Sequence, residues 1–187
     1  MIRREVLLLV ALLCGVSAGA QKVSVSTNIL NWADFATING EISFTVSRHV
    51  SLNAAGQYNG WSFGSVEKGN PFQDRVRGGA LGMRYWTWNV FSGWWFGLNA
   101  RCEEYNRGGL FGKMDTEEGF ALGVGLSLGY TYMLSRHWNL DFGIGGWCGG
   151  KSYTTYACPR CGTIIDKGRK FFAMPSADTQ ISIVYIF

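Results

Sequence analysis

Residues 121–134 alternate between two kinds of side chain, and this alternation constrains the fold more than any other feature of the sequence. One set of alternate positions carries large apolar side chains, whereas the other carries mostly glycine and small residues. The apolar set is Leu122, Val124, Leu126, Leu128, Tyr130, Tyr132 and Leu134. Successive side chains of a β-strand point to opposite faces, so a period of two predicts a strand with one apolar face.

The same period of two recurs in seven further segments of the chain. These segments are residues 23–30, 40–46, 50–58, 77–85, 94–103, 138–145 and 180–187. Their lengths are close to the 9–11 residues with which a tilted strand crosses a bilayer, and none shows the period of 3.6 that is typical of a helix. We therefore predict an all-β chain of eight antiparallel strands.

Residues 1–20 have the organisation of a secretory signal peptide. A pair of arginines is followed by the apolar residues 6–13 and by a small-x-small cleavage site that ends at Ala20. The apolar stretch is too short for a transmembrane helix, which needs about 20 residues. We expect export and cleavage, with residues 21–187 forming one domain in the outer membrane.

Composition indicates which face of the strands meets lipid. Only 16% of the residues are charged, compared with about 25% in soluble domains, and the chain has 26 glycines and 8 tryptophans. A soluble, lipocalin-like ligand-binding barrel is the weaker alternative, because it would place bulky side chains in a lumen too narrow for them. We predict a closed antiparallel transmembrane β-barrel with apolar residues outside and small or polar ones inside.

Connection lengths and tryptophans support this orientation. Long connections at about residues 59–76, 104–119 and 149–177 alternate with short turns, as they do in barrels with extracellular loops and periplasmic turns. We expect two aromatic girdles at the membrane interfaces. The inner girdle would hold Trp86, Trp88, Trp94 and Trp138, and the outer girdle Trp32, Trp61 and Trp147.

Five charged residues fall on the expected inner face. They are Glu41, Arg84, Arg101, Glu103 and Asp141. An eight-stranded barrel is filled by side chains, so we expect these charges to pair into a network that closes and stabilises the lumen. An ion pathway or gate is the alternative.

The connection at 149–177 is rich in basic residues. Lys151, Arg160, Lys167, Arg169 and Lys170 face only one acidic residue there, Asp166. Such a basic surface loop could hold the anionic headgroups of lipopolysaccharide or an acidic glycan. A solvated loop without a ligand is an equally good interpretation.

Two cysteines of the same connection are close in sequence. An exported protein meets oxidising conditions, so Cys158 and Cys161 are candidates for a local disulfide. Free thiols are a second interpretation. A zinc site is a third and weaker one, since it would need two further ligands and Cys102 and Cys148 would lie on strands separated by a third.

Two short turns are near copies of each other. Ser47-Arg48-His49 resembles Ser135-Arg136-His137, and these turns hold the chain's 2 histidines. A lipid-modifying enzyme of the outer membrane would need a nucleophile beside a base such as histidine. Both histidines are expected on the periplasmic side, away from outer-leaflet lipid, so we expect no enzymatic activity.

The last strand carries Ile183, Tyr185 and Phe187 on one face and ends in phenylalanine. A C-terminal strand of this kind resembles the signal that the outer-membrane barrel assembly machinery reads. We therefore expect this machinery to be a partner.

Several short motifs together resemble a known family over nearly the whole exported chain. They are Ser26-Thr27-Asn28-Ile29-Leu30, Tyr58-Asn59-Gly60-Trp61-Ser62-Phe63, Arg84-Tyr85-Trp86, Gly129-Tyr130, Arg136-His137-Trp138-Asn139-Leu140 and Cys158-Pro159-Arg160-Cys161-Gly162. The chain resembles the DUF3575 family of small outer-membrane β-barrel proteins of the Bacteroidota. The resemblance implies an envelope protein with an association with surface fimbriae, and it supplies no catalytic residues.

The sequence thus leads to one functional expectation. We expect a non-enzymatic outer-membrane barrel without a cofactor, which stabilises the envelope or displays surface loops for a partner. Expected partners are outer-membrane lipid and lipopolysaccharide, the assembly machinery and a surface or fimbrial protein, and nucleic acid is not among them.

Overall fold

The computed structural model describes residues 23–33, 36–63, 72–108, 115–158, 162–175 and 178–187, which form a single antiparallel sheet. The strands are β1 (Val23–Asn28), β2 (Ile38–Ser47), β3 (Val50–Asn59), β4 (Ser62–Phe63), β5 (Phe72–Trp86), β6 (Gly93–Gly108), β7 (Thr116–Met133), β8 (Trp138–Tyr156), β9 (Ile164–Met174) and β10 (Gln180–Ile186), and α2 spans Ile29–Ala33. The expected signal peptide, residues 1–20, lies outside the described residues.

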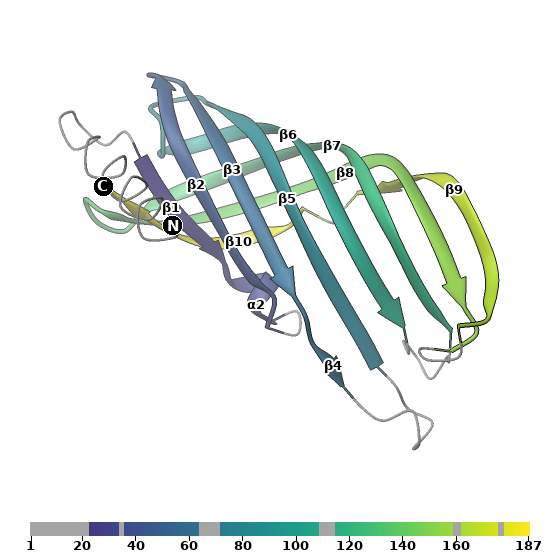
Figure 1. Ribbon diagram of the computed structural model, residues 1–187. Helices are drawn as coiled ribbons and strands as arrows, with labels where there is room; N and C mark the ends of the chain where they lie inside the picture. The colour runs from purple at the N-terminus through teal and green to yellow at the C-terminus, as the bar shows by residue number, and fades with distance from the viewer. Residues whose placement is uncertain (1–22, 34–35, 64–71, 109–114, 159–161, 176–177) are drawn as a thin grey trace, which may run out of the picture.

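The sheet closes on itself in a ring (Figure 1). Its strands follow the order β1, β2, β3, β5, β6, β7, β8, and β10 then pairs with both β8 and β1. The closing registers place Ser182 opposite Asp141 of β8 and opposite Asn28 of β1. This arrangement confirms the prediction of an antiparallel all-β chain, and each of the eight expected segments overlaps one strand of the ring.

One side of the ring is much taller than the other. Strands β5 to β8 have 15 to 19 residues, whereas β1 has 6 and β10 has 7. Strand β9 pairs with the far half of β8, where Tyr153 lies opposite Gly168. We call β5–β9 the tall wall, the end of the ring beyond β10 the tall end, and the opposite end, with the turns at 48–49, 87–92 and 134–137, the short-turn end.

The tall wall corrects the expected long loops. Most of residues 104–119 and 149–177 belong to β6, β7, β8 and β9, and β5 begins at Phe72, inside the expected connection 59–76. The apolar alternation ends in these parts because both faces carry polar groups. Cross-strand pairs such as Arg107–Asp74 (2.9 Å) and Lys151–Glu117 (2.6 Å) then stabilise the strands. A hydrophobic period therefore could not reveal them.

Strand β1 also ends earlier than expected. Residues Ile29–Ala33 form a short helix, and the side-chain oxygen of Asn28 accepts a hydrogen bond from the backbone N–H of Leu30 at 3.0 Å. Asparagine favours this position because its side chain satisfies N–H groups at a helix start. No helix within the described residues is both long and apolar enough to span a membrane.

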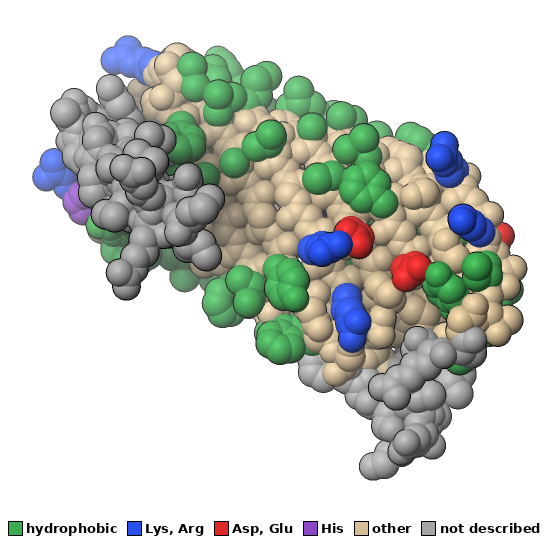
Figure 2. Space-filling model, viewed as in Figure 1, with side chains coloured by type: hydrophobic (Ala, Val, Ile, Leu, Met, Phe, Trp, Pro, Cys, Tyr) green, Lys and Arg blue, Asp and Glu red, His purple; other side chains and the backbone are tan. Residues whose placement is uncertain are grey.

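The two faces of the ring have opposite polarity. Large apolar side chains are exposed on the outer face of many strands, and Figure 2 shows such side chains standing out on the visible surface. They include Val25, Phe44, Leu52, Leu81, Phe96, Leu98, Leu122, Val124, Leu126, Leu128, Phe142 and Ile144. The interior instead buries polar groups, among them Ser43, Ser51, Arg84, Asn139, Asp141 and Ser182. This is the reverse of a water-soluble domain.

A small apolar cluster fills the short-turn end of the interior. It consists of Trp86, Phe91, Trp95, Val184 and Ile186, and we call it the plug. Trp95 is fully buried, and its ring packs where Gly129 and Gly143 leave room, since a Cβ atom at either glycine would collide with it. Phe91 (φ 67°) reaches the plug from the turn 87–92, where its carbonyl accepts a hydrogen bond from Asn139 at 2.8 Å.

The burial of two tryptophans corrects the expected girdles. Trp86 and Trp147 are buried, whereas Trp32, Trp61, Trp88, Trp94 and Trp138 are exposed. Trp86 donates a hydrogen bond from Nε1 to Ser51 Oγ at 2.9 Å, and the guanidinium of Arg101 lies 5.1 Å from the ring of Trp147. Polar partners inside the ring therefore hold both indoles on the inner face, which composition alone could not indicate.

Candidate functional site

Arg84 organises a buried ionic group directly above the plug. Its guanidinium lies 2.9 Å from a carboxylate oxygen of Glu41 and 3.4 Å from one of Asp141, and it stacks 4.5 Å above the ring of Trp95. Asp141 also accepts hydrogen bonds from Trp95 Nε1 (2.6 Å), Thr131 (2.8 Å) and Gln180 (2.8 Å). Four strands of the ring thus converge on one carboxylate.

A second ionic group lies closer to the tall end. Arg101 is 3.2 Å from Glu103 and 3.8 Å from Asp178, which also accepts a hydrogen bond from Asn99. Glu103 accepts a further hydrogen bond from Gln57 at 3.1 Å. The five charged residues expected inside the ring are therefore all on its inner face, where the structure divides them between two groups.

The interior opens into a cavity of about 410 Å³ at the tall end. Tyr105 donates a hydrogen bond to Glu117 at 2.8 Å, and Lys151 lies 2.6 Å from the same carboxylate. Trp147 and Phe172 add an apolar patch to its lining. Most charges of its lining therefore already have partners inside the ring, including Glu117, Lys151, Arg107 and Asp74.

Two groups of this cavity titrate away from their ordinary ranges. The outer faces of β6 and β7 become charged at Glu104 and Glu118. Tyr105 and Glu117 lie one residue further toward the tall end on the same two strands. Burial and the hydrogen bond to Glu117 raise the pKa of Tyr105. Burial alone would raise the pKa of Glu117, but hydrogen bonds from Lys151 and Tyr105 lower it. At neutral pH the tyrosine is therefore a neutral donor to a carboxylate.

Sequence reasoning missed several partners of the inner charges. Asp178, Trp95, Thr131 and Gln180 contact the expected residues. Trp95 and Thr131 occupy the inward set of alternate positions on β6 and β7, so the period of two could have placed them on the inner face. Asp178 lies between β9 and β10, where no alternation exists to assign a face.

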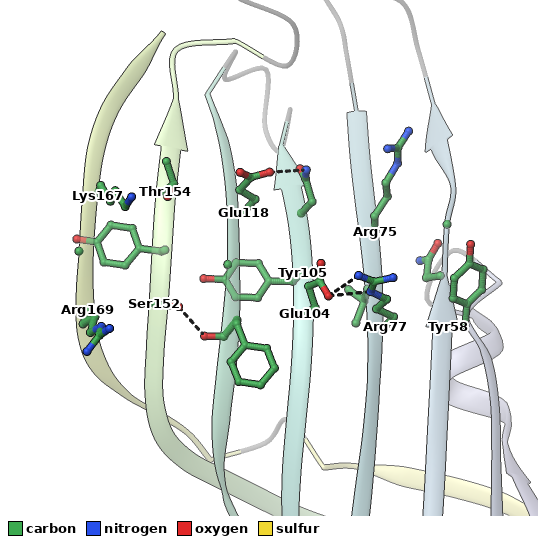
Figure 3. A pocket seen from close by; sticks show the side chains of 18 residues that line it. Tyr58, Arg75, Arg77, Glu104, Tyr105, Glu118, Ser152, Thr154, Lys167 and Arg169 are labelled. Carbon is green, nitrogen blue, oxygen red and sulfur yellow. Dashed lines mark hydrogen bonds and ion pairs between the residues drawn. The ribbon is translucent and has the colours of Figure 1, made fainter. Parts of the chain in front are cut away.

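The basic residues expected in one surface loop are instead divided between the two faces of strands. Lys151 lies inside against Glu117, and Lys170 lies 4.2 Å from the ring of Tyr153. Lys167 and Arg169 are exposed on the outer face of β9 (Figure 3), and Arg160 lies outside the described residues. The expectation of a single basic loop is therefore wrong.

A broad hollow of about 960 Å³ lies on the outer face of the tall wall (Figure 3). Two rows of register partners on β5 to β9 line it. The first row consists of Arg77, Glu104, Phe120, Ser152 and Arg169. The second row consists of Arg75, Asn106, Glu118, Thr154 and Lys167. Arg77 pairs with Glu104 at 2.6 Å. We call this surface the outer hollow, and its four cations against two carboxylates leave it basic.

The cysteines differ in state. Cys158 is disulfide-bonded, so its sulfur is not available as a zinc ligand. Cys161 lies outside the described residues, and the pairing of Cys158 with Cys161 stays a prediction. Cys102 and Cys148 are free thiols, and within the described ranges no group of three or more His, Cys, Asp and Glu residues is arranged to hold a metal.

The two near-copied turns use their histidines in the same way. His49 Nδ1 is 3.0 Å from the carbonyl oxygen of Trp86, and His137 Nδ1 is 2.9 Å from that of Ile186. The backbone carbonyls of His49 and His137 in turn accept hydrogen bonds of 2.8 Å from the N–H groups of Trp86 and Ile186. Each imidazole also lies beside a tyrosine ring, Tyr85 or Tyr185. The repeated motif therefore ties the end of a neighbouring strand to a turn.

We expect His49→Ala to lower the free energy of unfolding by about 0.5–1.5 kcal/mol, because the substitution removes one hydrogen bond at the strand end. Urea titration in detergent micelles, followed by tryptophan fluorescence, measures the change. Arg48→Ala in the same turn is the control and should stay within about 0.5 kcal/mol. Equal values for the two variants would contradict a structural role for the imidazole.

The C-terminal residues share a face as expected. Ile183 and Phe187 are exposed on the outer face, and the ring of Tyr185 lies 5.0 Å from that of Phe187. Val184 and Ile186 on the opposite face belong to the plug. The end of β10 therefore presents an apolar row outward while its other face holds the interior together.

With this geometry in hand, comparison with known proteins adds one finding. The family model described as "Protein of unknown function (DUF3575)" matches residues 6–187. The chain belongs to this family. No match was found among curated proteins or among solved structures. Membership of DUF3575 thus supports the resemblance seen in the sequence motifs, and the functional argument depends on the geometry described above.

Proposed function

We propose that this DUF3575 protein is a non-enzymatic β-barrel of the outer membrane whose tall wall stands above the bilayer as a binding surface. The inverted polarity of the ring carries the proposal. Its outer face exposes apolar side chains while its interior buries ion pairs. A soluble lipocalin-like barrel would have the opposite polarity, so we set that alternative aside.

The height of the apolar band supports a membrane location. On β7 the outward positions from Leu122 to Tyr132 are apolar and have no charged outward neighbour, whereas the outward Phe120 lies beside Glu104 of β6. At about 3.4 Å per residue and a tilt of about 40°, this stretch covers about 26 Å along the membrane normal. Lipid-facing bands of outer-membrane barrels are about 25 Å tall. Charged outward residues appear beyond this band at Arg77, Glu104 and Glu118, where water or headgroups would solvate them.

The filled interior supports a structural role over a pore. The plug occupies the short-turn end, and the Arg84 group connects β2, β5, β6, β7, β8 and β10 above it. Ion movement would have to break these buried contacts. We therefore interpret the inner charges as a network that stabilises the barrel, in preference to an ion gate.

The positions of the histidines favour a protein without catalytic activity. Each imidazole is occupied by a strand-end carbonyl at the short-turn end, far along the strands from the cavity at the tall end. The alternative of a lipid-modifying enzyme would need a base near outer-leaflet lipid. Loss of lipid A acyl chains on incubation with the purified protein would overturn the non-enzymatic proposal.

The outer hollow suits contact with anionic headgroups. Arg75 and Arg77 of β5 line one side of it beyond the apolar band, where lipopolysaccharide phosphates would lie. The opposite side, with Lys167 and Arg169 of β9, then remains available for a surface or fimbrial protein. In this proposal the outward row Ile183, Tyr185 and Phe187 is read by the barrel assembly machinery during insertion.

Epitope tags on intact cells test the proposed topology. A tag inserted after Gly162, between β8 and β9, should bind antibody on intact cells, because the proposal places the tall end outside. A tag beside His137 should bind antibody only after the outer membrane is permeabilised. Labelling of the His137 tag on intact cells would invert the orientation, and labelling of neither tag in an envelope fraction would argue against the outer membrane.

A further inference from the structure

The tall wall ends in a strand with an unused edge. Strand β9 pairs with β8 along one side, and within the described residues no backbone hydrogen bond joins its other side to another element. Closer to the short-turn end, β10 pairs with β8 in place of β9. The other side of β10 pairs with β1, which ends at Asn28 opposite Ser182. Beyond that level β9 is the last strand of the sheet.

This edge is long and accessible. Strand β9 has 11 residues, and all except Gly168 and Phe172 are exposed. About half of the N–H and C=O groups of an antiparallel strand point away from its partner, so β9 offers a row of unpaired groups. A bilayer interior does not tolerate such an edge, so the part of the edge available for binding is residues 164–170, which lie beyond the register level of Leu122.

We propose that the free edge of β9 binds an extended, acidic segment of a partner protein, which adds one more strand to the tall wall. An exposed edge is a template for strand addition, with main-chain hydrogen bonds supplying affinity and side chains supplying specificity. The inference rests on the proposed function and deepens it, because it names the surface and the chemistry of the partner.

The charge of β9 indicates which partner strand fits its edge. The strand carries three cations, Lys167, Arg169 and Lys170, and one carboxylate, Asp166. A second copy paired edge to edge would bring these cations against themselves, and like charges on neighbouring strands are destabilising. A partner strand with glutamate or aspartate beside Lys167 and Arg169 would gain cross-strand pairs instead. The other face of the added strand would lie beside Gly168 and Phe172, which are on the inner face of β9.

Peptide binding to the purified full-length protein in detergent micelles tests this inference. The probe is a fluorescent eight-residue peptide that alternates valine with glutamate, and its anisotropy reports binding. We expect Lys167→Glu together with Arg169→Glu to weaken binding by about ten-fold or more, since two favourable cross-strand pairs become repulsive. Arg48→Glu, an equal charge change in a short turn at the other end, is the matched control and should leave binding unchanged.

A second probe separates strand addition from simple charge attraction. N-methylation of alternate peptide residues on the edge that would pair with β9 removes main-chain donors without changing charge, so binding should be lost. Equal binding of the methylated peptide, or equal binding to the double variant, would overturn the inference, as would no binding to the folded protein. Dimers in analytical ultracentrifugation that disappear in the double variant would identify a second copy as the occupant and also overturn it.

The proposed function has a separate readout in the same preparations. Insertion of the protein into lipid vesicles, followed by tryptophan fluorescence, does not depend on the peptide. A protein that inserts but does not bind the peptide disproves the β9 inference alone, whereas one that fails to insert disproves the membrane barrel.

Discussion

Leu126→Arg is expected to destabilise the protein by about 2–4 kcal/mol in lipid vesicles, because it places a charge near the middle of the lipid-facing band. The side chain of Leu126 is 69% exposed on the outer face of β7. In a water-soluble protein a substitution at so exposed a position would change stability by about 0.5 kcal/mol at most. The size of the effect therefore distinguishes a membrane barrel from a soluble one.

The matched control lies on the same strand and face. Phe120→Arg is beyond the apolar band, between the outward residues Glu104 of β6 and Ser152 of β8, and should cost at most about 1 kcal/mol. Denaturant titration of both variants after folding into vesicles gives the comparison. Equal costs for Leu126→Arg and Phe120→Arg would contradict the membrane band.

Arg84→Met is expected to cost about 3–5 kcal/mol, since breaking a buried ionic group leaves charges without compensation. The substitution would leave the carboxylates of Glu41 and Asp141 in the interior without the guanidinium that lies between them. It would also remove the cation above the ring of Trp95. Two measurements should report the change. The folded band in SDS gel electrophoresis should disappear at a lower incubation temperature, and the denaturant midpoint in detergent micelles should fall.

Arg77→Met provides the control on the same strand. Arg77 faces outward, where its pair with Glu104 is more than half exposed, and exposed pairs contribute only about 0–1 kcal/mol. The double variant Arg84→Met with Glu41→Gln should recover part of the loss, because it removes one of the two unpaired carboxylates. A small effect of Arg84→Met, or the absence of any recovery, would contradict a stabilising role for the inner network.

These two experiments examine complementary parts of the proposal. The Leu126→Arg experiment tests whether lipid surrounds the ring, and the Arg84→Met experiment tests whether the inner ionic network stabilises it. Together with the plug, a strong Arg84 effect would explain how a short-walled side made of β10, β1, β2 and β3 can support a tall wall of strands up to 19 residues long. The tall wall would then be a rigid platform for the edge of β9.

The sequence by itself determined the strands of the ring and their faces. A period of two is a local property, because neighbouring residues on a strand must point to opposite sides. Leu126 could therefore be placed outside, and Arg84 and Asp141 inside, without knowledge of any neighbouring strand. The same reasoning failed at β9, where Lys167, Arg169 and Lys170 give both faces similar polarity.

Only the tertiary structure decided which inner groups meet. Arg84 and Asp141 are 57 residues apart in sequence, and Arg84 and Glu41 are 43 apart. Their contact depends on the registers of several strand pairs, none of which is encoded within one strand. The burial of Trp86 and Trp95 in the plug depends on the same registers, and so does the unpaired edge of β9. Alternation is set by the geometry of one chain segment, whereas pairing is set by how distant segments align when the ring closes.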